Sequence, residues 1–184
     1  MRKSLVLLLS FFACLSLATG WIIGGGMVFL NLTGWNLSTG LIDSTYSAEL
    51  GLDFDIGRTI EGTATNLYNL ELIGKVPLYR MDNVTFGPSV ALMYGNFPSS
   101  ASTDTSWKLN FSAGVFGEFE LGNLILSFGF LYPFGSDFDF MKAIYTSVKF
   151  FVNPPNRNFD DKLFLGLDLL NGRIRLMIGL IEPF

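Results

Sequence analysis

The chain has 184 residues but no histidine, and its single cysteine is Cys14. Ser-His-Asp and Cys-His nucleophile systems and the usual zinc sites need side chains that this composition does not supply. We therefore expect no enzymatic activity, no catalytic residue, no cofactor and no bound metal.

Charged residues are scarce as well. They make up 15% of the chain, and the formal net charge is −4, whereas about a quarter of an average globular domain is charged. A soluble domain this poor in charge has difficulty covering its surface with polar groups. A surface that faces lipid has no such difficulty. The acidic balance also removes the electrostatic case for a nucleic-acid partner.

The N-terminal apolar run, from Leu5 to Leu17, is shorter than the roughly 20 residues that a membrane-spanning helix needs. Arg2 and Lys3 precede it, and Ser16-Leu17-Ala18 supplies a small-x-small cleavage pattern. These features predict a cleavable signal peptide over residues 1–18, followed by one domain over residues 19–184. Cys14 would leave with the signal peptide, so the mature chain would hold no disulfide.

From about Tyr46 onward, apolar and polar residues alternate with a period of two. A β-strand points alternate side chains to opposite faces, so each such segment has one apolar and one polar face. Clusters of Gly, Asn, Asp, Pro and Ser separate nine strand-like segments. These are approximately Ile22 to Trp35, Thr45 to Gly57, Asn66 to Arg80, Val84 to Asn96, Thr105 to Leu121, Asn123 to Pro133, Phe140 to Asn153, Asp161 to Leu170 and Arg173 to Phe184.

Asp82-Asn83, Gly122-Asn123 and Asn171-Gly172 are short connectors that tolerate positive φ and predict hairpin turns. Most segments are long enough for tilted membrane strands, which need about 9–11 residues in the hydrocarbon. Single-chain bacterial barrels have an even number of strands, so a count of nine is off by one. We predict an all-β, closed antiparallel up-and-down transmembrane β-barrel with eight strands, and ten strands as the alternative.

The two faces of the predicted strands differ in chemistry. The apolar face is expected to contact lipid, with an interfacial aromatic girdle at the strand ends made of Trp35, Tyr46, Tyr68, Tyr94, Trp107 and Tyr132. The interior of a small barrel is filled by side chains, and we expect the opposite face to form a mutually neutralising charge network there. Its members are Glu49, Asp53, Asp55, Glu71, Lys75, Lys108, Glu118, Glu120, Lys149, Asp168, Arg173 and Arg175.

The last segment ends in Phe184 and carries Leu176, Ile178 and Leu180 on one face. It resembles the C-terminal assembly signal of outer-membrane proteins, although Glu182 stands where that pattern has an apolar or aromatic residue. The predicted mature chain resembles the small outer-membrane barrels typified by the membrane domain of outer membrane protein A. The resemblance implies a place in the cell outer membrane, with the lipid bilayer and the barrel assembly machinery as partners.

Three functions are compatible with these patterns. The first is an integral outer-membrane protein with a structural or surface-interaction role, whose lumen is plugged by the charge network and whose external loops contact an unspecified partner. The second is a narrow, porin-like channel for small solutes or ions, which gains weight if the barrel has ten or more strands. The third is a secreted lipocalin-like carrier, in which the apolar face lines a ligand cavity and the charged face meets water.

Overall fold

The computed structural model describes residues 19–29, 32–43, 49–59, 66–96, 106–134, 140–152, 162–170 and 172–183. The predicted signal peptide, the girdle residue Tyr46 and the C-terminal Phe184 lie outside these residues. None of the helices in the described ranges has the length and hydropathy to cross a membrane.

Strands dominate the described chain. They are β1 (Gly20–Phe29), β2 (Leu32–Ile42), β3 (Glu49–Thr59), β4 (Asn66–Lys75), β5 (Tyr79–Met81), β6 (Val84–Gly95), β7 (Lys108–Leu121), β8 (Leu124–Phe134), β9 (Ile144–Phe151), β10 (Lys162–Leu170) and β11 (Arg173–Pro183). One short helix, α2 (Phe140–Ala143), precedes β9.

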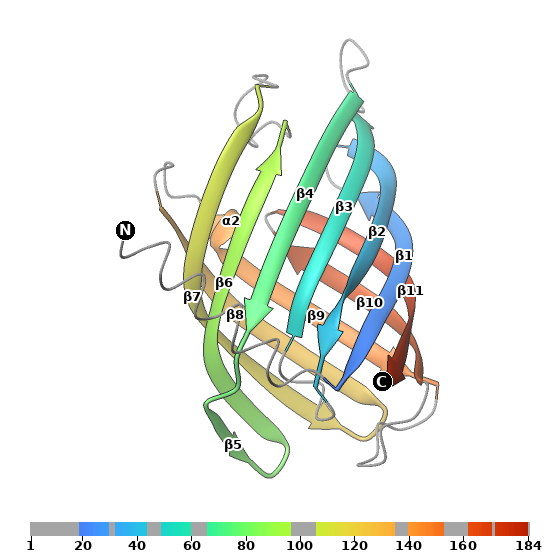
Figure 1. Cartoon of the computed structure of the whole chain (residues 1–184), viewed down its shortest axis with the longest axis vertical. Coiled ribbons are helices and arrows are strands. Elements are labelled where there is room, and N and C mark those ends of the chain that lie inside the picture. The colour runs from blue at the N-terminus through green and yellow to red at the C-terminus, as the bar shows by residue number, and fades with distance from the viewer. Residues whose placement is uncertain are drawn as a thin grey trace.

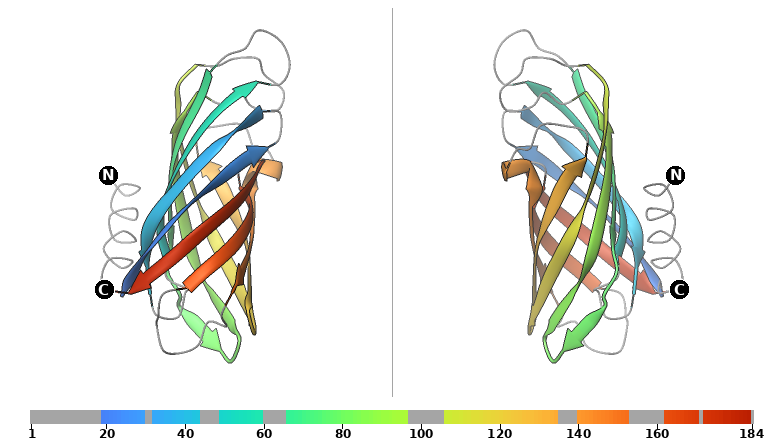
Figure 2. Two further views of the ribbon diagram at one scale, coloured as in Figure 1. Left: turned by 90° about the vertical axis from the view of Figure 1, so that its right-hand side faces the viewer. Right: turned by 90° about the vertical axis from the view of Figure 1, so that its left-hand side faces the viewer.

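The strands form one antiparallel sheet that closes on itself (Figure 1). The strand order is β4-β3-β2-β1-β11-β10-β9-β8-β7-β6-β5, and an additional pairing of β4 with β6 closes the circle. Ten strands make the closed wall, while β5 pairs with β6 alone and prolongs the sheet beyond one rim. Figure 2 shows the strong tilt of the strands and this projecting hairpin. Closure leaves no long strand edge unpaired.

The predicted all-β, closed, antiparallel barrel is confirmed, but the preferred count of eight strands is wrong, and the alternative of ten is correct. The predicted segment Ile22 to Trp35 merges two strands, because β1 ends at Phe29 and β2 begins at Leu32. Only two residues separate them. None of the predicted segments covers the rest of β2, from Asn36 to Ile42.

Two other predicted segments are divided in the structure. Asn66 to Arg80 breaks into β4 and β5: Lys75 lies opposite Ser89, whereas Tyr79 lies opposite Phe86, so one extra residue stands between them. This is a β-bulge, and it includes Pro77, which has no N–H to donate to the sheet. Phe140 to Asn153 begins with α2 and becomes a strand only at Ile144.

The three predicted hairpin connectors are turns between neighbouring strands. Asp82, Gly122 and Gly172 have φ angles of 48°, 60° and 69°. This left-handed backbone favours glycine and is tolerated by Asp and Asn. The short connectors therefore provide the backbone geometry that their sequences predicted.

Gly20 of β1 lies opposite Pro183 of β11, so both ends of the described barrel lie at one rim, which we name the terminal end. The opposite rim is named the loop end. An even number of strands accounts for this placement, which nine strands could not. Ten residues connect β9 to β10 at the terminal end, whereas the turn at Gly172 connects β10 to β11 at the loop end with two residues.

The outer face of the wall is apolar, and the buried charged side chains point into the lumen. Leu163, Leu165 and Leu167 of β10 point outward and are each about half exposed, whereas Phe164 between them is buried. The same alternation runs through the other long strands. A lipocalin-like carrier needs the reverse arrangement, so the structure contradicts that third alternative.

Candidate functional site in the barrel lumen

Arg175 lies at the centre of an ion-pair cluster inside the barrel, which we name the arginine cluster. It extends from β11 to β3 and β4, and its side chain has 0% exposure. The guanidinium donates to Asp55 Oδ2 at 2.7 Å, to Glu71 Oε2 at 2.9 Å and to Asp53 Oδ2 at 3.3 Å. These contacts connect strands that do not neighbour one another in the sheet.

Arg173, two residues away on the same face of β11, joins this cluster. Its Nη1 lies 2.6 Å from Asp55 Oδ2, and its Nη2 lies 3.2 Å from Glu71 Oε2. Two arginines therefore share two carboxylates, in charge-assisted hydrogen bonds that are stronger than neutral ones. Removing one member would leave its partners buried with uncompensated charge.

Two asparagines complete the surroundings of Asp55. Asn36 of β2 and Asn69 of β4 lie opposite Asp55 in the sheet, and their Nδ2 groups donate to its two oxygens at 2.8 Å and 3.3 Å. Among the described residues, the Oδ1 atoms of both asparagines and of Asp53 are buried without a hydrogen-bond donor. The two amide groups thus donate hydrogen bonds to the carboxylate, while their own oxygens accept none.

Glycines occupy several inward-facing positions of the two strands that separate Arg175 from Asp53 and Asp55. Arg175 lies opposite Val28 of β1, and the carboxylates that it reaches are on β3, beyond β2. The inward-facing positions of β1 and β2 include Gly24, Gly26, Gly34 and Gly40. A Cβ at Gly26, Gly34 or Gly40 would collide with a backbone carbonyl oxygen of the neighbouring strand, so these glycines allow the strands to approach closely.

A second cluster, which we name the lysine cluster, lies closer to the terminal end. Lys75 Nζ lies 2.6 Å from Glu49 Oε2, and Lys149 Nζ reaches the same oxygen at 3.2 Å from β9. Lys75 also donates to the Tyr145 hydroxyl at 3.3 Å and lies 3.9 Å from Glu118. Ser127 donates to Glu118 Oε2 at 2.7 Å. Like the arginine cluster, this group joins distant strands across the lumen.

A small cavity lies between the two clusters. Its volume is about 20 Å³, and it is lined by Glu49 and Lys149 from one cluster, by Asp53 and Arg175 from the other, and by Asp168. Asp168 accepts a hydrogen bond from Ser147 on the neighbouring strand. A cavity of this size has room for about one water molecule.

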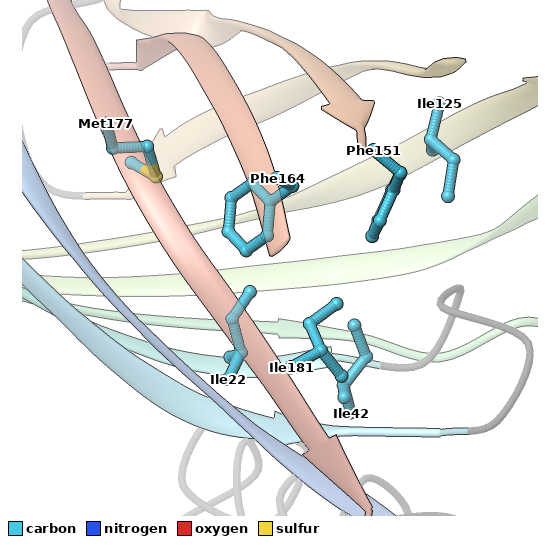
Figure 3. Close-up of a cluster of buried hydrophobic side chains, with 7 residues drawn as sticks. All are labelled: Ile22, Ile42, Ile125, Phe151, Phe164, Met177 and Ile181. Carbon is cyan, nitrogen blue, oxygen red and sulfur yellow. The ribbon is translucent and has the colours of Figure 1, made fainter. Parts of the chain in front are cut away.

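Apolar side chains fill the lumen at the terminal end (Figure 3). Phe151 and Phe164 approach with ring centroids 5.8 Å apart, and Phe164 has 0% exposure. They belong to a cluster that we name the apolar plug: Ile22, Ile42, Ile125, Phe151, Phe164, Met177 and Ile181. Its residues come from six strands, so it holds the rim of the barrel together.

Most of the residues predicted for the charge network meet inside the lumen. Glu49, Asp53, Asp55, Glu71, Lys75, Glu118, Lys149, Asp168, Arg173 and Arg175 take part in the contacts described above or line the cavity. Lys108 and Glu120 do not: Lys108 is exposed, and Glu120 pairs with Arg80 at 3.1 Å at a site that is about one-third exposed. Both lie near the ends of β7, where the inward parity continues but the lumen no longer encloses it.

The network also contains residues that charge alone did not single out. Tyr145, Ser127, Ser147, Asn36 and Asn69 supply its uncharged hydrogen bonds. The alternation of faces could have identified Tyr145, Ser127, Ser147 and Asn69, which lie at inward-facing positions of predicted segments. Asn36 was missed because β2 was not recognised beyond Trp35.

Five of the predicted girdle aromatics lie towards the loop end: Trp35, Tyr68, Tyr94, Trp107 and Tyr132. The Tyr68 and Tyr94 rings lie 6.4 Å and 4.9 Å from that of Trp107, so these three form a continuous group on the outer wall. Trp21 and Tyr79, which were not predicted for the girdle, are exposed at the terminal end. Aromatic side chains therefore occur on the outer wall near both rims.

Comparison with protein-family models, curated proteins and solved structures finds no match to this chain. Within the described ranges, no group of three or more Asp, Glu, His or Cys side chains is arranged to hold a metal ion. The geometry of the barrel and its two ion-pair clusters is therefore the basis for the functional argument.

Proposed function

We propose that the chain is an integral outer-membrane β-barrel protein with a structural or surface-interaction role and a closed lumen. The observation that carries the proposal is the inverted distribution of polarity. Large apolar side chains cover the outer wall, whereas the buried interior holds the ion pairs of the arginine and lysine clusters. An apolar surface of this extent is costly in water and is the required coat in lipid.

The placement of exposed charge supports a membrane band. On the described residues, the exposed charged side chains are Arg80, Asp82, Lys108 and Glu182, all at or beyond strand ends. Between them the outer wall is apolar, and exposed aromatics lie near both rims. This is the pattern of a barrel whose middle faces hydrocarbon and whose rims reach the interfaces.

The filled interior supports a closed rather than a conducting lumen. Ion pairs cross it at two levels, and the apolar plug occupies the terminal end. The space between the clusters has a volume of only about 20 Å³. A hydrated ion would have to displace several buried side chains to pass.

Depth-dependent fluorescence quenching tests the proposal. Single-tryptophan variants that retain Trp21, Trp35 or Trp107, the others being replaced by Phe, would be reconstituted in vesicles whose lipids carry bromine at a chosen depth. We expect headgroup-proximal bromine to quench all three. A Leu167→Trp probe in a background without other tryptophans should instead be quenched best by bromine near the bilayer centre. A protein that stays monomeric in buffer without detergent, and shows no quenching in vesicles, would contradict the proposal.

A narrow pore is the second candidate, and the ten-stranded wall favours it, because ten strands enclose a wider interior than eight. Planar-bilayer recording separates the two. The closed lumen predicts no steady conductance for the unmodified protein, whereas a reproducible single-channel current would favour the pore.

A further inference from the structure

The seam between β1 and β11 differs from every other pairing in the closed wall. The other pairings join strands that follow one another along the chain, apart from β4 and β6, which are separated only by β5. β1 and β11 lie at opposite ends of the sequence, so no turn fixes how they align. Their register nevertheless sets the stagger of the barrel, and with it the strand tilt and the diameter.

The middle of this seam offers few side chains to define that register. Gly24 lies directly opposite Gly179, and Gly25 and Gly26 follow in β1. Cross-strand side-chain pairs are what distinguish one alignment from another, and glycine-rich strands specify their register weakly. A slip of two residues would keep every side chain on its present face.

One specific contact crosses the seam on the outer wall. Trp21 Nε1 donates to Glu182 Oε2 at 3.0 Å, and the two residues are register partners at the terminal end. Glu182 is also the residue that departs from the apolar pattern of the last segment. Its carboxylate therefore has a position-specific partner on the first strand.

A second contact fixes β11 from inside the lumen. Arg175 binds Asp53 and Asp55, and these lie on β3, which is joined to β1 through β2. A two-residue slip of β11 in one direction would bring Met177 to the place of Arg175 and leave part of the carboxylate group without a cation. A slip in the other direction would bring Arg173 to the place of Arg175, so the inner contacts oppose the first slip, whereas the Trp21–Glu182 contact is lost in both.

We propose that Trp21–Glu182 outside and Arg175–Asp53/Asp55 inside together set the register in which the first and last strands close the barrel. Trp21 and Glu182 are 161 positions apart in the sequence, and Arg175 is 120 positions from Asp55, yet these contacts align the two strands as a turn does at the other pairings.

Engineered disulfides can measure the register of β1 against β11. In a full-chain Cys14→Ala background, Ile23→Cys with Leu180→Cys joins residues that are register partners on the outer face. Ile23→Cys with Ile178→Cys, and Gly25→Cys with Leu180→Cys, report slips of two residues in the two directions. Directly opposed residues lie within disulfide reach, whereas diagonal neighbours are at or beyond its limit.

The three cysteine pairs are placed in four backgrounds: unmodified, Glu182→Leu, Arg175→Met, and the double variant. Arg80→Met with Glu120→Leu, which removes an ion pair distant from the seam, is the matched control. After refolding in detergent and mild oxidation, the unmodified and control proteins should form the 23–180 disulfide almost exclusively. The double variant should lose most of this product, at least fivefold, and gain one of the slipped disulfides.

If the double variant does not fold, the single variants still test the proposal. Each should fold into a barrel and form more of a slipped disulfide than the control protein does. Native 23–180 crosslinking at the control level in both single variants would overturn the proposal. A decrease of the 23–180 disulfide without any slipped disulfide, in all variants, would also overturn it. That result would indicate loss of folding and no change of register.

Discussion

The two faces of one strand show how this barrel is built. On β3, Leu52 and Ile56 point outward and are about two-fifths exposed, whereas Asp53 and Asp55 between them are almost completely buried. A water-soluble domain has the opposite arrangement, since charged residues are almost never fully buried unless they are paired. Here every buried carboxylate of β3 meets an arginine from across the lumen. The wall therefore separates two environments, and each face is stabilised by a different interaction.

Breaking the inner face should have the largest effect. Arg175→Met removes the cation shared by Asp53, Asp55 and Glu71 while keeping most of the side-chain volume. Removing one partner of a buried ion-pair group costs about 3–5 kcal/mol. We expect a decrease of that size in the free energy of unfolding, measured by urea titration in detergent micelles. A change below about 1 kcal/mol would show that the cluster contributes little.

Placing a charge on the outer face should have the next largest effect. Leu167→Arg, at a mid-strand position that is 47% exposed, should destabilise the barrel in a bilayer by about 2–4 kcal/mol. Ser112→Ala, on the inward face of β7, is the control and should be nearly silent. Equal effects of the two substitutions on unfolding in lipid vesicles would contradict the assignment of the faces.

A single hydrogen bond within the lysine cluster should contribute less. Ser127→Ala removes the donor to Glu118 and leaves that buried oxygen with one partner fewer. The expected loss is about 1–3 kcal/mol. The same unfolding titration measures it, and an unchanged midpoint would indicate that another group replaces the serine.

The exposed ion pair at the rim should have the smallest effect. Arg80 and Glu120 are about one-third exposed, and such surface pairs contribute about 0–1 kcal/mol. Arg80→Ala should therefore lower stability only slightly, and the difference should decrease further when salt is added. A loss comparable to that of Arg175→Met would remove the distinction between lumen and rim.

The alternation of faces predicted the barrel and the orientation of its strands because period-two patterns are local. The count failed where local signals were weak. The two residues between Phe29 and Leu32 in the sequence are Leu30 and Asn31, which do not make the usual polar cluster, and Gly24 to Gly26 resemble an interruption although they lie within β1. The bulge at Pro77 likewise lies within a segment that reads as continuous.

The alternation of faces predicted which charged residues face the lumen, but it did not predict which of them form ion pairs with one another. Parity placed Arg175 and Asp55 on the inner face, yet 120 residues separate them, and only the closed wall brings them to 2.7 Å. Lys108 shares the inner parity but lies where β7 reaches the rim, so parity alone misplaced it. Which carboxylate meets which base depends on strand number and stagger, which local patterns do not contain.

Gly20 and Pro183 are neighbours at one rim. The chain could therefore begin at a different strand and still place every strand beside its present neighbours. A short peptide joining the two ends, with a new break at the Gly122 turn, would give a circular permutant with the same neighbours. In that permutant the glycine-rich pairing would be held by a covalent connection, and the pairing of β7 with β8 would become the one that has to find its own alignment.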